Sequence, residues 1–126
     1  MGIIGVGSDL VEIKRIAEVL SKYGEKFSHR ILSDYEMGEF NKNCYPINFL
    51  AKRFAVKEAA AKAFGLRAGK IFQHFEIFHD DYGQPHLKCW QTVALIAEDI
   101  GVKCIHVTIT DEREYALATV IIETNY

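Results

Sequence analysis

The residues whose types and spacing best suit chemistry are Glu58 and Lys62, an acid and an amine one helical turn apart. They belong to a strongly helix-forming stretch, residues 49–64, that is rich in Ala and Lys. At about 100° per residue they share a narrow strip with Ala51 and Ala55, where small side chains let a ligand or another chain segment approach the backbone. Charges held beside an apolar helix are usually paired or bound to a metal, so this strip is a candidate site.

An ordinary surface ion pair is the alternative for Glu58 and Lys62. With the acid on the N-terminal side, their spacing stabilises an exposed helix by about 0.2–0.5 kcal/mol. The bulky side chains of the stretch do not gather on one stripe, so we expect the helix to be covered on most sides and to leave little free water for a charge. Arg53 and Lys57 lie on a different side, where they either form a basic solvated face or meet a second anion.

Asp9 is the third candidate. The glycine-containing segment 3–9 has the pattern of a short buried strand that ends at Asp9 and allows close backbone approach. From Leu10 to about Ser21 the apolar residues recur at helical spacing, and Asp9 with Glu12 has the form of a capping box. Asp9 is therefore either an N-cap residue or a functional carboxylate at a strand end.

Several basic residues lie outside these stretches. Lys14 and Arg15 are adjacent in the helix expected after Asp9, and Arg30 follows in the next segment. They are either plain surface residues or a patch for an acidic partner. The segment 65–70 is a short flexible loop with two positive charges, which suits an anion contact or an exposed turn.

The elements that position these groups follow from the remaining pattern. Ser33 and Glu36 form a capping box for a helix to about Phe40, and the long helix stops at Gly65. The last strand is apolar on both faces, so we expect a helix on one face and another subunit on the other. The result is an α+β domain with a long central helix on a mostly antiparallel sheet. The other expected elements are a hairpin at 75–79 and 86–89, a helix at 90–100, and strands at 103–110 and 115–123.

Composition limits the class of protein. The 126 residues form a single domain, 1–126, with 49% hydrophobic and 25% charged residues. The net charge of −2 argues against nucleic-acid binding driven by bulk charge. Without a membrane-length apolar run or a signal-peptide pattern, we expect a cytoplasmic protein. The three cysteines are odd in number and widely spaced, which indicates neither a disulfide framework nor a thiolate zinc site.

Two segments carry a specific likeness. Residues 7–15 read Gly-Ser-Asp-Leu-Val-Glu-Ile-Lys-Arg, and residues 53–63 read Arg-Phe-Ala-Val-Lys-Glu-Ala-Ala-Ala-Lys-Ala. They resemble the G-x-D-x-x-x-x-x-R and K-E-A-x-x-K-A motifs of the holo-acyl-carrier-protein synthases, the small 4′-phosphopantetheinyl transferases. The likeness extends over essentially the whole chain, including the Gly83-Gln-Pro85 turn and the two closing strands.

The resemblance implies a 4′-phosphopantetheinyl transferase-like fold and an enzyme of fatty acid biosynthesis. Such an enzyme transfers 4′-phosphopantetheine from coenzyme A to a serine of apo-acyl carrier protein and leaves adenosine 3′,5′-bisphosphate. It also implies a Mg²⁺ cofactor and a homotrimer with active sites between subunits. The trimer would account for a last strand that is apolar on both faces.

By the same resemblance, Asp9 and Glu58 ligate Mg²⁺ and, with Lys62, form the catalytic set. Mg²⁺ usually takes one or two carboxylates with waters and phosphate oxygens, which these residues supply. Lys62 would contact the phosphates. The base that takes the serine proton is either a metal-bound water or hydroxide or one of the two carboxylates. Further expected contacts are Arg53, Gly65 and His106 for coenzyme A, and Arg15, Phe27 and Arg30 for the acyl carrier protein.

The sequence departs from the family pattern at two places. After the strand that carries His106 it reads Thr110-Asp111 where many relatives have Ser-His, so no second histidine is assigned. The loop at 65–70 is about two residues shorter than in the relatives, so the resemblance does not assign each of its phosphate contacts to a residue. Neither departure affects Asp9, Glu58 or Lys62.

Two other functions compete with the transferase. A different Mg²⁺-dependent enzyme acting on a nucleotide diphosphate would use the same carboxylates and lysine, but would not require a carrier protein. A non-catalytic module would bind an acidic helical partner through Arg15 and Arg30 and would need no metal. A pure binding module gives no reason for an acid and a lysine on an Ala-lined strip, so the transferase is the preferred interpretation.

Overall fold

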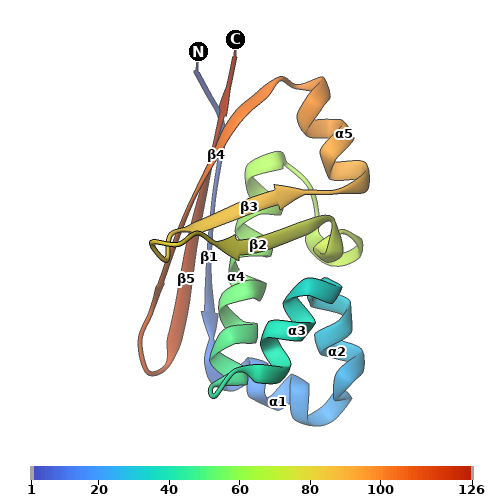
Figure 1. The fold of residues 1–126 in the computed structure, drawn as a ribbon, viewed down its shortest axis with the longest axis vertical. Helices are drawn as coiled ribbons and strands as arrows, with labels where there is room; N and C mark the ends of the chain where they lie inside the picture. Colours follow the sequence, from blue (N-terminus) through green and yellow to red (C-terminus); the bar gives the residue numbers. More distant parts are fainter. Residues whose placement is uncertain (1, 126) are drawn as a thin grey trace.

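A three-stranded antiparallel sheet stands against one long helix, α4 (Pro46–Phe64), as Figure 1 shows. The computed structural model describes residues 2–125. The strands are β1 (Gly2–Glu12), β4 (Val102–Asp111) and β5 (Tyr115–Thr124), in the order β1-β5-β4. Both pairings are antiparallel. This arrangement confirms the predicted α+β domain with a central helix on an antiparallel sheet.

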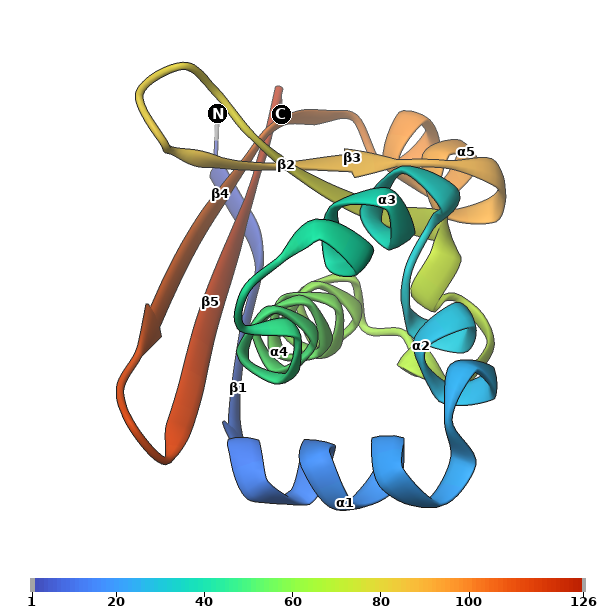
Figure 2. The same ribbon diagram turned by 60° about the horizontal axis from the view of Figure 1, so that its bottom comes forward.

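Helix α4 begins and ends as its sequence predicts. Pro46 occupies the first turn, where its missing N–H costs nothing. Gly65 takes a left-handed conformation with φ of 72° and donates its N–H to the last carbonyls, which ends the helix. Figure 2 looks along α4 and shows it enclosed by β1, α1, α2 and α3. The three short helices are α1 (Ile13–Tyr23), α2 (Glu25–Ile31) and α3 (Asp34–Lys42).

The boundary between β1 and α1 corrects one prediction. The strand does not end at Asp9 but continues to Glu12, and Asp9 pairs with Ala118 of β5. Helix α1 starts only at Ile13, so Asp9 does not cap it, and its N-cap residue makes no capping bond through its side chain. Leu10 would be buried in a helix from that position, but it is 63% exposed. Ladder hydrogen bonds to β5 satisfy this backbone, and this tertiary pairing overrides the local helical pattern.

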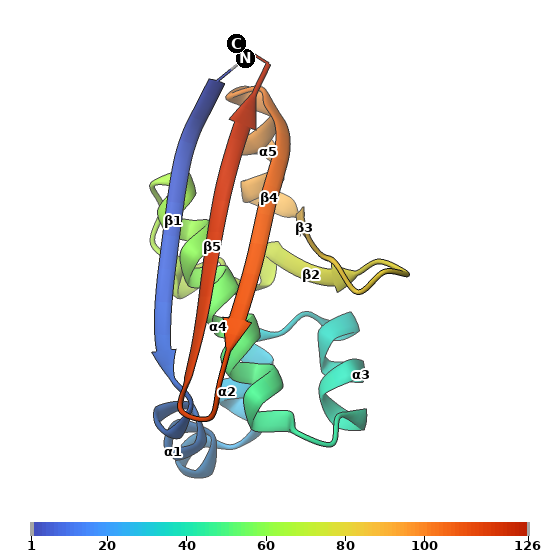
Figure 3. The ribbon, with the colours of Figure 1, turned by 90° about the vertical axis from the view of Figure 1, so that its left-hand side faces the viewer.

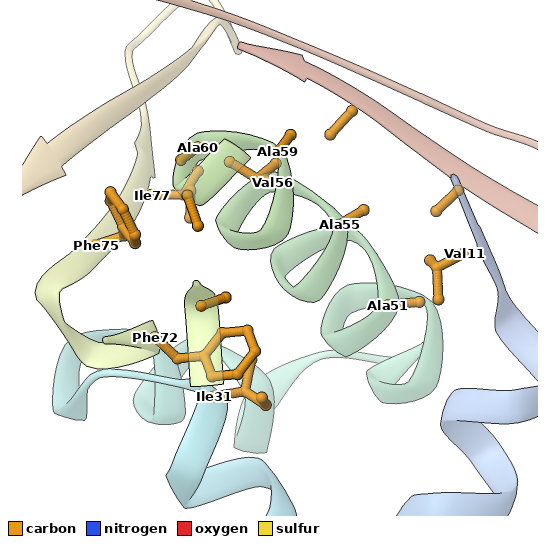
Figure 4. Close-up of a cluster of buried hydrophobic side chains, with 14 of the residues drawn as sticks. Val11, Ile31, Ala51, Ala55, Val56, Ala59, Ala60, Phe72, Phe75 and Ile77 are labelled. Carbon is orange, nitrogen blue, oxygen red and sulfur yellow. The ribbon is translucent and has the colours of Figure 1, made fainter. Parts of the chain in front are cut away.

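The main chain of β1 lies directly on the main chain of α4. A Cβ atom added at Gly7 would lie 1.9 Å from the carbonyl oxygen of Ala59, and one at Gly5 would lie 1.9 Å from that of Ala63. Figure 4 shows Ala59 and Ala55 of α4 directed toward the strands, with Ala51 beside Val11. The segment that approaches the small side chains of the helix is therefore β1 itself.

A second, two-stranded sheet covers another side of α4. Strands β2 (Phe75–His79) and β3 (Pro85–Cys89) form the predicted hairpin, and α5 (Gln91–Asp99) follows it. Phe75 and Ile77 of β2 are fully buried in the core with α4. Two short 3₁₀ turns, Ala68–Lys70 and Phe72–His74, connect α4 to this hairpin.

The outer face of the three-stranded sheet carries exposed apolar side chains, mainly on β1 and β5, that nothing in the described chain covers. On the inner face of β5, Val120 and Ile122 are fully buried, whereas Leu117 on the outer face is 39% exposed. Val6 and Leu10 of β1 add to the outer face, which is turned toward the viewer in Figure 3. The helix expected on one side of the last strand is therefore present. Within residues 2–125, no helix is long and apolar enough to cross a membrane.

Candidate functional site

The contact between β1 and α4 brings Asp9 to Lys62. The ammonium Nζ of Lys62 lies 3.1 Å from Oδ1 of Asp9 and donates a hydrogen bond of 2.8 Å to the carbonyl oxygen of Ser8. The Asp9 side chain is 17% exposed and that of Lys62 is 52% exposed. A carboxylate and an ammonium predicted from separate segments thus meet at an open edge of the sheet. Lys62 is more exposed than expected for a helix covered on most sides.

Glu58 belongs to the same cluster. Partial burial raises the pKa of Glu58, the nearby Asp9 carboxylate raises it further, and Lys62 opposes both effects. Glu58 is thus close enough to Asp9 for their charges to repel, and it lies one helical turn before Lys62 on α4. The structure therefore brings together the three residues predicted to be catalytic.

The donor set fits a hard divalent cation. Two carboxylates that repel one another attract a cation between them, and Mg²⁺ typically takes one or two carboxylates and fills its other positions with waters and substrate phosphates. No group of three or more His, Cys, Asp or Glu side chains that could hold a metal occurs among residues 2–125. A zinc site built from protein ligands alone would need such a group. The chemistry of Asp9 and Glu58 suits Mg²⁺ bound together with a phosphate ligand.

Arg53 and Lys57 do not form a basic solvated face. Their side chains are 3% and 0% exposed, and both contact Glu36, which is also fully buried. The second anion is thus a carboxylate of the protein itself. Burial lowers the pKa of Lys57, and Glu36 opposes that shift. The sequence identified Glu36 only as a capping-box residue, a role that the structure confirms through its contacts with Ser33.

A cavity of about 740 Å³ lies beside Arg53, between the start of α4, the turn of the β2–β3 hairpin and β4. Nε of Arg53 makes no hydrogen bond, and its ion pairs with Glu36 and Glu39 are both as long as 3.5 Å. A guanidinium at a cavity wall, held only by such long contacts, can bind an anion. The charged and titratable groups of the wall are Glu39, Tyr45, Lys52, Arg53, His79 and Asp111.

This cavity and the Asp9 cluster lie on opposite edges of the sheet. Asp9 lies on β1, and the cavity is lined by Thr108 and its neighbours on β4, with β5 between the two strands. His106 also belongs to β4, is 53% exposed, and has its Nε2 3.5 Å from Oε1 of Glu123. Within one chain the structure does not bring His106 to Asp9. Gly65, in contrast, follows the end of α4 three positions after Lys62.

The predicted partner-binding residues lie on the α1 and α2 side. Arg15 and Arg30 are exposed, and Arg30 donates a hydrogen bond of 3.1 Å to the carbonyl oxygen of Gly69. Phe27 is half-buried, with its ring centroid 6.4 Å from that of Phe54. Two exposed cations and an aromatic ring are therefore available on neighbouring helices, which Figure 2 shows around α4.

Comparisons with known proteins agree with this arrangement. The sequence profile of the 4′-phosphopantetheinyl transferase superfamily matches residues 5–120. The holo-[acyl-carrier-protein] synthases of Salmonella newport (strain SL254) and Klebsiella pneumoniae (strain 342) are 52% and 50% identical to this chain, covering 98% of it and 100% of their own lengths.

Solved structures give the same result. The crystal structure of holo-[acyl-carrier-protein] synthase from Neisseria meningitidis has a TM-score of 0.91 and 36% identity, covering 98% of this chain and 100% of that one. The enzyme from Bacillus anthracis, solved in complex with CoA (3′,5′-ADP), has a TM-score of 0.80 and 32% identity, covering 98% of both chains. The relatives therefore share this fold over its whole length.

Proposed function

This chain belongs to the 4′-phosphopantetheinyl transferase superfamily, and we propose that it transfers 4′-phosphopantetheine from coenzyme A to a serine hydroxyl of apo-acyl carrier protein. A bond forms between the serine oxygen and the phosphorus of the phosphopantetheine group, and the serine proton passes to a base. The bond from that phosphorus to the bridging oxygen of the diphosphate breaks, and adenosine 3′,5′-bisphosphate leaves. The observation that carries the proposal is the meeting of Asp9, Glu58 and Lys62 at one edge of the sheet. Relatives of 50–52% identity over their full length are named holo-[acyl-carrier-protein] synthase.

Asp9 and Glu58 are the residues that would hold Mg²⁺. When bound, Mg²⁺ supplies positive charge that offsets the negative charge of the diphosphate. Lys62 is held by Asp9 and by the carbonyl oxygen of Ser8, so its ammonium is fixed beside the two carboxylates. From there it donates to a phosphate oxygen on which negative charge grows during transfer. Holding the phosphorus in line with the serine hydroxyl contributes the rest of the rate enhancement.

The cavity beside Arg53 is the proposed site for the nucleotide end of coenzyme A. The Arg53 guanidinium lies in the wall of this cavity, where its Nη2 side, 3.5 Å from Glu39, suits a phosphate group. His106 and Gly65 are further proposed contacts. Because Asp9 and the cavity lie at opposite edges of the sheet, a complete site needs the β1 edge of one subunit and the β4 edge of its neighbour. A homotrimer would provide this, and the uncovered apolar face of the sheet supports such an assembly.

The acyl carrier protein is the proposed macromolecular substrate. Arg15 and Arg30 would contact acidic side chains of the carrier, and Phe27 would contribute apolar area between them. Fatty acid biosynthesis in the cytoplasm is the corresponding biological setting.

The decisive experiment mixes the protein with apo-acyl carrier protein, coenzyme A and Mg²⁺ and weighs the carrier by mass spectrometry. We expect the mass of one phosphopantetheine to be added, and its addition to stop when EDTA is present. Asp9→Ala and Glu58→Ala should each abolish transfer while retaining the circular dichroism spectrum of the folded protein. If the carrier gains no mass under saturating conditions, the proposal is wrong.

Two controls separate the competing functions. A different Mg²⁺-dependent enzyme would consume coenzyme A or another nucleotide diphosphate when the carrier protein is left out. A non-catalytic module would bind its carrier equally well after Glu58→Gln and without Mg²⁺, but would never change the carrier's mass.

A further inference from the structure

Glu36 is a fully buried carboxylate in the first turn of α3, and it accepts contacts from three elements. Its Oε1 lies 3.0 Å from the backbone nitrogen of Ser33 and 2.5 Å from Nζ of Lys57. Its Oε2 lies 3.0 Å from the backbone nitrogen of Ile77 and 3.5 Å from Nε of Arg53. Each oxygen is therefore held by one backbone amide and faces one cation.

These contacts fix the carboxylate in place. The two amides belong to the start of α3 and to β2, while the two cations belong to α4. Lys57 also donates a hydrogen bond of 2.6 Å to the carbonyl oxygen of Ile31, so its ammonium is anchored on two sides. If the Glu36 carboxylate rotated, a buried amide or a buried cation would lose its partner, which costs free energy.

Arg53 has a different carboxylate on each side of its guanidinium. Glu36 faces Nε from the buried side, and Glu39, which lies at the cavity and has a 37% exposed side chain, faces Nη2 at 3.5 Å. The fixed anion behind Arg53 limits the positions that the guanidinium can take. The exposed carboxylate of Glu39 contacts Arg53 at the cavity, the side from which a ligand phosphate would approach.

We propose that Glu36 is a positioning residue for coenzyme A, which holds the Arg53 guanidinium in the wall of the cavity so that its Nη2 side, where Glu39 lies, faces the nucleotide end. Lys57 balances the charge of Glu36 and does not touch the ligand. Glu39 competes with the ligand for the same guanidinium. This inference rests on the proposed function, because it takes the cavity to be the nucleotide site.

The test uses the charge-balanced double variant Glu36→Gln/Lys57→Met, which removes the buried ion pair without leaving an unpaired charge. Transfer is measured with coenzyme A varied at saturating carrier protein, and binding of adenosine 3′,5′-bisphosphate is measured by calorimetry. We expect KM for coenzyme A and Kd for adenosine 3′,5′-bisphosphate to rise about fivefold or more, because a misplaced charged donor loses most of its contribution. The kcat at saturating coenzyme A should be retained.

Glu39→Gln is the matched control, because it removes a carboxylate at the same 3.5 Å distance from Arg53 and from the same helix. It should lower KM for coenzyme A, since it removes a competitor. A rise of equal size in both variants would mean that the loss of either carboxylate near Arg53 has the same effect, so that Glu36 has no specific positioning role, and would overturn the inference. A purely structural role of Glu36 would lower kcat through loss of folded enzyme and leave KM unchanged, which would also overturn it.

Arg53→Met separates this inference from the proposed function. If Arg53→Met weakens adenosine 3′,5′-bisphosphate binding and the double variant does not, Glu36 has no positioning role while the assignment of the cavity stands. If Arg53→Met leaves binding unchanged, the cavity is not the nucleotide site, and the inference about Glu36 falls with that assignment.

Discussion

Glu58 carries its negative charge at a position where the fold penalises it. Partial burial and the Asp9 carboxylate both raise its pKa, and Lys62 offsets part of the effect. A carboxyl group whose pKa is higher in the folded than in the unfolded state stabilises the fold at pH values below its unfolded pKa. That contribution is lost as the pH rises through the folded pKa. The ionised Glu58 carboxylate therefore destabilises the metal-free fold, and a bound cation would offset this effect.

Removing this charge should stabilise the metal-free protein. In EDTA at about pH 8, we expect Glu58→Gln to melt at a higher temperature than the wild type, because no charge is then partly buried there and the repulsion with Asp9 is gone. The difference should disappear on acidification to about pH 4, where Glu58 of the wild type is itself protonated. Differential scanning fluorimetry across this pH range measures both. A lower melting temperature for the variant at the higher pH would contradict the electrostatic account.

Cys89 should be nearly inert toward thiol reagents in the folded protein. Burial raises the pKa of its thiol to about 11, so at about pH 8 only about one molecule in a thousand carries the reactive thiolate. Iodoacetamide labelling followed by peptide mapping should therefore modify the exposed Cys44 well before Cys89. In denaturant the two cysteines should react at similar rates. Early labelling of Cys89 in the native protein would show that its strand opens readily.

At the scale of elements, the packing of β1 on α4 places the site. Gly5 and Gly7 remove the side chains that would separate strand from helix, and the strand then carries Asp9 to Lys62. The position of the acid thus depends on two glycines that themselves do no chemistry. The substitution of either glycine tests this link between packing and the site.

We expect Gly7→Ala to destabilise the protein by more than about 3 kcal/mol, because its Cβ would lie 1.9 Å from the carbonyl oxygen of Ala59 and neither backbone can yield cheaply. Any folded fraction should transfer phosphopantetheine poorly, since β1 would be displaced from Lys62. Urea unfolding and the mass assay measure the two effects.

Gly38→Ala is the control for this substitution. Gly38 lies within α3 and has open space around it, so alanine there should stabilise the protein by about 0.5–1 kcal/mol. A Gly7→Ala variant as stable as Gly38→Ala would show that the two backbones are not in contact.

The elements with strong local signals were predictable from the sequence. The cap at Ser33, the stop at Gly65 and the β2–β3 hairpin follow from residue chemistry that acts over a few positions. The end of β1 was not predictable in this way. Leu10 fits both a helical and a strand pattern, and only pairing with the distant β5 decides between them.

The residues of the candidate site were likewise predictable from the sequence only in part. The motifs identify Asp9, Glu58 and Lys62, and the structure brings them together as expected. The environment of Arg53 and Lys57 was missed, because the partner of both, Glu36, lies in another helix and already had a local explanation as a capping residue. Spacing along the sequence predicts contacts within one helix or strand, whereas the cluster around Glu36 joins α3, α4 and β2.

At the scale of the whole molecule, the two halves of the proposed site lie apart. The Asp9 cluster is at the β1 edge, the cavity beside Arg53 is at the β4 edge, and β5 separates them. The outer face of the same sheet leaves Val6, Leu10 and Leu117 exposed. An assembly that covers this face can also join the edge of one copy to the opposite edge of the next, which links oligomerisation to activity.

Subunit mixing tests this link. Asp9→Ala and Arg53→Met should each be poorly active at limiting coenzyme A, but a mixture that is unfolded together and refolded should regain activity. If each site takes Asp9 from one subunit and Arg53 from its neighbour, random assembly of equal amounts restores about a quarter of the wild-type activity. Transfer is measured by the mass assay, and size-exclusion chromatography with light scattering gives the oligomeric state. No recovery in a correctly assembled mixture would place the whole site within one chain.

The contact of main chain with main chain between β1 and α4 also bears on how such a protein can evolve. The spacing of the two backbones that carry Asp9 and Lys62 is set by main-chain contact at Gly5 and Gly7, and backbone atoms are common to every amino acid. A lineage can therefore exchange most of its interior side chains, and drift far in sequence, without retuning the reacting groups, provided that those two glycines persist.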